Sequence, residues 1–107
     1  INTASAIGWG TLKLAGGTID NTSGQPVTLT TNNAQNWNAD FTYGGTNDLN
    51  LGTGAVTLSA SLTITANGSA NLTVAGAIGD GGHGFSLTKT GTGSLVLTGF
   101  YVRHFWR

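Results

Sequence analysis

The sequence predicts an all-β protein, a parallel β-solenoid of about four to five turns that each use about 23 residues. Three observations predict this fold. Short segments alternate apolar and polar residues, similar segments recur at a nearly constant spacing, and the composition is rich in glycine (18 residues) with a single proline. Helix-favouring Glu is absent and Lys and Arg are scarce, so strands joined by glycine and asparagine turns are expected throughout.

Eight segments of three residues carry an apolar side chain at their first and third positions. This period of two is typical of a strand with one buried face and one exposed face. Glycine, asparagine or serine separates nearly all of the segments, so each strand is expected to be short. In chain order the segments are 12–14, 27–29, 49–51, 56–58, 62–64, 72–74, 85–87 and 95–97.

Four of these segments form a ladder. Val27 and Leu49 are 22 positions apart, and the steps to Leu72 and then to Leu95 take 23 positions each. Such a period is typical of a solenoid, in which each turn stacks on the previous one and corresponding strands pair in parallel. The inward aliphatic pairs are therefore expected to stack into one continuous column.

A second ladder is expected between segments 62–64 and 85–87, again 23 positions apart. This spacing would bring two outward threonines, Thr63 and Thr65, beside Ser86 and Thr88. A flat ladder of hydroxyls would suit an ice-binding surface. Outward threonine is also the ordinary choice for an exposed strand, which is the favoured interpretation of two rungs.

A glycine motif introduces the strand at each end of the chain. Residues 8–16 read GWGTLKLAG and residues 91–99 read GTGSLVLTG, with a weaker copy, GTGAVTL, at 52–58. Only the copy at 91–99 has a lysine just before it, Lys89. A phosphate-binding loop needs Gly-Lys-Ser/Thr between a strand and a helix. The motif therefore predicts a turn that leads into a strand and no nucleotide site.

Composition argues against several classes of function. Charged residues make up 7% of the chain and the net charge is zero, which argues against binding nucleic acid. There is no cysteine, hence no disulfide and no thiolate metal site, and no apolar run long enough for membrane insertion as a helix. No cofactor is expected. The start at Ile1, without a basic leader, is expected of a processed product or a piece of a longer chain.

Catalytic residues are scarce. The acids are Asp20, Asp40, Asp48 and Asp80, and only Asp40 and Asp48 flank a common turn. Aspartates at turns usually cap their own backbone, so we expect no enzyme, and a polysaccharide-active β-helix is the weaker alternative. His83 and His104 have no obvious partner. Asp80 next to GGHG at 81–84 favours a flexible turn over a calcium site, because calcium requires several oxygen ligands.

Two aromatic residues, Trp37 and Phe41, lie in or beside an asparagine-rich segment and are the candidate ligand contacts. Trp37 among amides could stack on a sugar ring. The favoured alternative is that these rings fill a wide layer of the core.

Residues 87–99, LTKTGTGSLVLTG, resemble the autotransporter-associated β-strand repeat, and residues 8–16 are similar to the same unit. The resemblance covers roughly residues 8–99. It implies a right-handed parallel β-helix in the passenger region of a bacterial autotransporter-like protein, exposed on the cell surface or secreted. The pattern stops after Gly99, where FYVRHFWR forms an atypical aromatic and basic tail at 100–107.

These observations predict a β-helix segment over 1–99 that acts as a non-catalytic stalk and presents adhesive regions, with flanking repeats of the same polypeptide as its partners. The alternative is an adhesin module that binds surface glycans. The isolated fragment is expected to associate end to end through its open edges.

Overall fold

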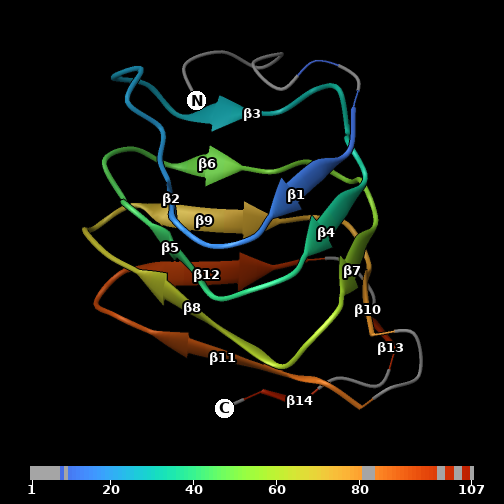
Figure 1. The fold of residues 1–107 in the computed structure, drawn as a ribbon. Helices are drawn as coiled ribbons and strands as arrows, with labels where there is room; N and C mark the ends of the chain where they lie inside the picture. The colour runs from blue at the N-terminus through green and yellow to red at the C-terminus, as the bar shows by residue number, and fades with distance from the viewer. Residues whose placement is uncertain (1–7, 9, 81–83, 99–100, 103–104, 107) are drawn as a thin grey trace.

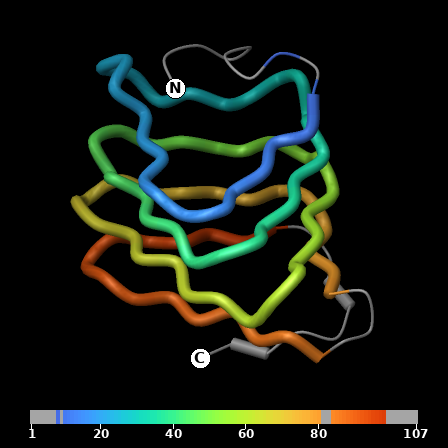
Figure 2. Tube along the Cα trace, in the orientation of Figure 1, coloured from blue at the N-terminus to red at the C-terminus, as the bar shows by residue number. Residues whose placement is uncertain are grey.

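The chain winds into a solenoid in which each full turn contributes one strand to each of three parallel sheets (Figure 1). The computed structural model describes residues 8, 10–80, 84–98, 101–102 and 105–106. The predicted fold class is confirmed as an all-β parallel β-solenoid of about four turns with a period near 23 residues. Figure 2 shows the turns stacked one on another along the molecule.

The three sheets form the three sides of the solenoid. Sheet A comprises β1 (Leu12–Leu14), β4 (Gln35–Trp37), β7 (Val56–Leu58), β10 (Ile78–Gly79) and β13 (Tyr101–Val102). Sheet B comprises β2 (Thr18–Ile19), β5 (Phe41–Tyr43), β8 (Leu62–Ala66), β11 (Ser86–Thr90) and β14 (Phe105–Trp106). Sheet C comprises β3 (Val27–Thr28), β6 (Leu49–Asn50), β9 (Asn71–Val74) and β12 (Ser94–Leu97).

Sheet C confirms the first predicted ladder. Val27 pairs with Leu49, Leu49 with Leu72 and Leu72 with Leu95, all in parallel strands. Leu49 and Leu72 are fully buried, at 1% and 0% exposure. The column forms because parallel pairing in register places identical faces directly over one another, so each aliphatic pair covers the pair before it.

Sheet B corrects the second predicted ladder. Leu87 pairs with Leu62 and Lys89 with Ile64, so β11 lies 25 positions from β8 instead of 23. A shift of two residues keeps every side chain on its own face, so the alternating pattern cannot distinguish the two registers. The segment that joins sheet A to sheet B is longer in the later turn. Seven residues, 80–86, separate Gly79 from Leu87, whereas only four, 58–61, separate their partners Thr57 and Leu62 one turn earlier.

Six strands were not predicted by the alternating pattern: β2, β4, β5, β10, β13 and β14. The reason is clearest in β4, where the inward positions are Gln35 and Trp37. Gln35 is 1% exposed, and its Oε1 accepts a hydrogen bond of 3.0 Å from the indole Nε1 of Trp37. A polar residue therefore occupies a core position, which hides the strand from a pattern based on hydrophobicity.

Polar side chains connect successive turns. Asp48 Oδ1 accepts a 2.8 Å hydrogen bond from the backbone amide of Asn71, 23 residues later. Asn32 Oδ1 accepts one of 2.9 Å from the amide of Thr53, and Ser61 Oγ one of 3.0 Å from the amide of Ser86. These side chains satisfy backbone donors at the corners, where the sheets end.

The region of the predicted tail continues the solenoid order where the structure describes it. β13 pairs in parallel with β10 in sheet A, and β14 pairs in parallel with β11 in sheet B.

Candidate ligand-binding face

The outward face of sheet B carries a column of four threonines. Thr18 pairs with Thr42, Thr42 with Thr65 and Thr65 with Thr90, on the successive strands β2, β5, β8 and β11. The Oγ1 atoms of Thr65 and Thr90 are 3.0 Å apart and share a hydrogen bond. Thr18 and Thr90 are exposed, and Thr42 and Thr65 are half-buried between their neighbours.

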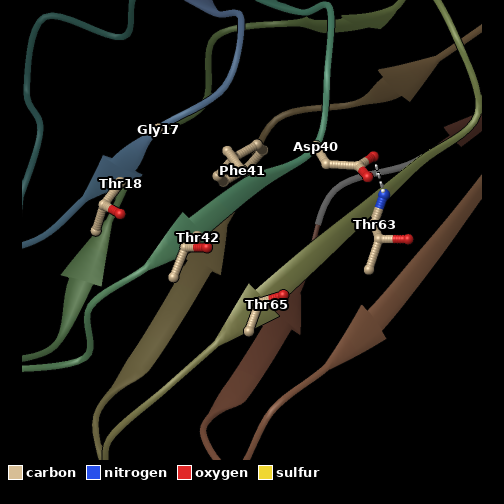
Figure 3. Close-up of a pocket in the computed structure, with 7 residues that line it drawn as sticks. All are labelled: Gly17, Thr18, Asp40, Phe41, Thr42, Thr63 and Thr65. Atoms are coloured by element: carbon tan, nitrogen blue, oxygen red, sulfur yellow. Dashed lines mark hydrogen bonds between the residues drawn. The ribbon is translucent and has the colours of Figure 1, made fainter.

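A second outward column runs beside the first. Thr63 pairs with Thr88, and Asp40 lies above Thr63, whose backbone amide donates a 2.8 Å hydrogen bond to Asp40 Oδ1. Figure 3 shows the threonine hydroxyls of β2, β5 and β8 on one side of the sheet, with the Asp40–Thr63 bond at its edge. From β2 to β11, the outward positions of sheet B therefore present mainly hydroxyl and methyl groups, with one carboxylate at Asp40.

An open hollow of about 310 Å³ lies on this face. Its lining consists of Gly17, Thr18, Asp40, Phe41, Thr42, Thr63 and Thr65 (Figure 3). Gly17 has no side chain, and a Cβ built there would meet no atom within 4 Å. A side chain at position 17 would therefore have room to extend at this hollow.

Asp40 and Asp48 each connect one turn to the next through a hydrogen bond. Asp40 precedes β5 and binds the amide of Thr63, and Asp48 precedes β6 and binds the amide of Asn71. Each carboxylate accepts a hydrogen bond from the turn that follows it by 23 residues. This role agrees with the expectation that the aspartates cap backbone amides, although the amides belong to the next turn.

Asp20 and Tyr43 form a polar corner between sheets B and C. Burial pushes the pKa of Asp20 up, but hydrogen bonds from the hydroxyl and amide of Thr46 and from the amide of Asn21 outweigh it, so the pKa lies below its ordinary value. The Tyr43 hydroxyl donates to the carbonyl of Asn47. Burial, together with the charges of Asp20 and Asp48, raises the pKa of Tyr43 to about 12. These groups support the corner and are not arranged around a cavity.

The structure places both candidate ligand contacts, Trp37 and Phe41, in the core. Trp37 is 0% exposed and Phe41 is 3% exposed, and their ring centroids are 5.2 Å apart at an interplanar angle of 72°. This edge-to-face packing fills the wide layer of the column. Both rings are covered, as the favoured interpretation of Trp37 and Phe41 as core-filling residues predicted.

The Lys89 ammonium is used within its own turn. Its Nζ donates a 2.9 Å hydrogen bond to the carbonyl of Gly91. Gly91 has φ +87°, and a Cβ there would lie 2.3 Å from the carbonyl oxygen of Ala66 in the preceding turn. The glycine of this motif is therefore required by close stacking of two turns, in agreement with the turn prediction and not with a phosphate loop.

The described part of the chain contains no group of three or more His or Asp side chains placed to share a metal ion. Asp80 is 2% exposed, and its Oδ2 accepts a 2.9 Å hydrogen bond from the amide of Gly84. His83 and His104 lie outside the described residues. No helix in the described ranges has the length and apolar character to span a bilayer.

The threonine column was the feature that sequence reasoning missed. The steps from Thr18 to Thr42, Thr65 and Thr90 are 24, 23 and 25 positions, so no single period connects them. The signal that could have found them is the Thr-x-Thr pattern at 63–65 and 88–90, aligned by the threonines themselves instead of by the flanking apolar residues.

Comparison of the chain with models of protein families, with curated proteins and with solved structures gave no match. The resemblance to the autotransporter-associated repeat therefore depends on the residues of the motif itself.

Proposed function

We propose that this chain is a non-catalytic structural segment of a bacterial autotransporter-type passenger, exposed on the cell surface or secreted, and that it forms a β-helical stalk supporting adhesive regions. The observation that carries the proposal is the column of sheet C, in which four successive strands stack in register. A column of this kind can be extended by any number of similar turns, which is the requirement for a stalk.

The energetics of the fold suit this role. Each turn covers the aliphatic pair of its neighbour, and side chains such as Asp48 and Asn32 accept hydrogen bonds from the next turn. Stability in such a fold is approximately the sum of the turns and of the contacts between neighbours. Flanking turns of the same polypeptide are therefore the partners that this segment fits best, and each turn adds about 4.8 Å of length.

The repeat-like motif at 87–99 supports the assignment to an exported passenger. Two of its residues have clear roles in the solenoid: Leu87 is 0% exposed in the core, and Gly91 allows the turn between β11 and β12 to stack on the preceding turn. Similar roles occur one turn earlier, where Leu62 is 3% exposed and a Cβ at Gly68 would lie 2.5 Å from the carbonyl oxygen of Gly45, as expected for a unit that recurs along a long passenger.

The stalk proposal is tested by adding one turn. A second copy of residues 49–71, inserted after Asn71, adds 23 residues and preserves the register of Leu49 over Leu72. We expect unchanged β-structure per residue by circular dichroism and a rod about 5 Å longer by small-angle X-ray scattering. As the matched control, a copy of residues 49–59 alone breaks the register and should lower stability strongly. If both insertions give the same stability and the same rod length, the stacked column of sheet C does not hold the fold together.

The role at the cell surface needs a second experiment. The chain would be placed between an epitope and an outer-membrane anchor, with and without the additional turn. On intact bacteria, antibody should reach the epitope in both cases, and the distance from the membrane should increase with the added turn. An epitope that is digested or inaccessible in the presence of the folded segment would contradict the stalk proposal.

A further inference from the structure

The outward face of sheet B differs from the outward faces of the other two sheets. Its central column is threonine on all four strands from β2 to β11. Sheet A has Lys13, Asn36 and Thr57 at its outward paired positions, and sheet C has Thr28, Asn50, Thr73 and Val96. If outward threonine were only the default for exposed strands, the same uniformity would be expected on all three sides.

The threonines of sheet B form a lattice in two directions. Along the solenoid axis the rungs repeat at the strand spacing, about 4.8 Å, and along a strand the two columns are two residues, or about 6.6 Å, apart. Threonine is branched at Cβ and has few rotamers, so its hydroxyl and methyl are held in place by the backbone. The hydroxyls of Thr65 and Thr90 lean toward each other, with their oxygens 3.0 Å apart, and a hydrogen bond holds them there.

A regular array of hydroxyl and methyl groups on neighbouring strands can order the water that covers it, including the water in the hollow lined by Thr18, Thr42, Thr63 and Thr65. Hydroxyls can bond waters at the lattice sites, and the methyls between them are covered by water that bonds to other water. We infer that the outward face of sheet B, built on Thr18, Thr42, Thr65 and Thr90 with Thr63 and Thr88 beside them, binds ice.

Two further observations favour ice over a glycan on this face. Sugar rings are commonly held by an exposed aromatic face, but the two rings of β5 are covered: Phe41 is 3% exposed and Tyr43 is 0% exposed. The charged residue beside these threonines, Asp40, already accepts a 2.8 Å hydrogen bond from the backbone amide of Thr63. The face therefore presents mostly neutral hydroxyls and methyls, which suit a neutral lattice of water.

The test measures thermal hysteresis of the whole chain and its binding to an ice crystal, with the solenoid verified by circular dichroism. The wild-type chain is expected to show hysteresis that rises with concentration. Thr18→Lys should reduce it, because an exposed lysine would project from the lattice. Thr28→Lys on sheet C is the matched control, since Thr28 is also exposed and also lies in a two-residue strand, and it should leave hysteresis unchanged.

The central variants Thr42→Lys and Thr65→Lys should abolish hysteresis. If either fails to fold, the comparison of Thr18→Lys with Thr28→Lys still decides. A folded wild-type chain without hysteresis overturns the inference, as does an equal loss in the Thr28→Lys control. Binding on a glycan array that Thr42→Lys removes, without hysteresis in the wild type, would assign the face to a glycan instead. The stalk proposal does not depend on these outcomes, because its test is the length and register of the column.

Discussion

The hydroxyl oxygens of Thr65 and Thr90 lie 3.0 Å apart on the neighbouring strands β8 and β11, although the residues are separated by 25 positions. This hydrogen bond links two turns on the outside of sheet B. It can form only in the register that also places Lys89 on Ile64. The outer face and the inner column of this sheet are therefore set by the same pairing.

The aliphatic column should dominate stability. Leu72 is 0% exposed between Leu49 and Leu95, so Leu72→Ala removes contacts to both neighbouring turns. We expect a loss of about 2–5 kcal/mol in the free energy of unfolding, measured with urea. Thr73→Ala, the next residue and outward on the same strand, should cost less than about 1 kcal/mol. Equal losses from both variants would contradict the inward and outward assignment of β9.

Close stacking of turns should make Gly45 intolerant of a side chain. Gly45 has φ +76°, and a Cβ there would lie 1.8 Å from the carbonyl oxygen of Asn67 in the next turn. Gly24 has a similar φ of +83° but open space around its Cβ position. Gly24→Ala should therefore report only the backbone cost, about 1–2 kcal/mol, and Gly45→Ala clearly more. Similar unfolding midpoints for the two variants would show that the corner opens without cost.

The carboxylate of Asp48 should stabilise the solenoid, because it accepts a 2.8 Å hydrogen bond from the backbone amide of Asn71. Asp48→Ala should lower the free energy of unfolding by about 1–3 kcal/mol, because the amide loses its partner. Asp48→Asn keeps an acceptor oxygen and should recover most of the loss. A polysaccharide assay on the same samples provides the functional check. Turnover by the wild type that disappears in Asp40→Asn or Asp48→Asn would contradict the non-catalytic proposal.

Alkaline pH should destabilise the fold through Tyr43. The pKa of Tyr43 is raised from an ordinary value of 10.0 to about 12, so the folded chain retains a proton that the unfolded chain has lost in this range. The contribution is complete below pH 10 and is lost as the pH rises toward 12, by roughly 2–3 kcal/mol. Urea unfolding at a series of pH values measures it. Tyr43→Phe should flatten the dependence, and an unchanged slope would assign it to other groups.

End-to-end association is expected for the isolated chain. β12 is the outer strand of sheet C in the described part of the chain, and its Val96 is 36% exposed. An outer strand offers unpaired backbone groups to another chain. Light scattering coupled to gel filtration should show a mass that rises with concentration, and Val96→Lys should reduce the increase. A constant monomer mass at high concentration would contradict this prediction.

The fold was predictable because two independent signals agree. The period of two places Leu49, Leu72 and Leu95 on one face, and the spacing of 23 brings the same residues together on neighbouring strands. β4 was not predictable in this way, because Gln35 occupies an inward position and finds its partner in Trp37. A polar residue in the core is recognisable only when its hydrogen bond is known.

The sequence by itself determined the all-β class, the parallel stacking and the column of sheet C, because nearly constant segment lengths there leave one register that buries every aliphatic pair. Tertiary structure alone decided the register of sheet B, the burial of Trp37 and the four-strand threonine column. The physical reason is that a two-residue shift preserves the face of each side chain. The register that forms depends on how many residues each corner segment places between two strands. That number is fixed only when the turns pack together.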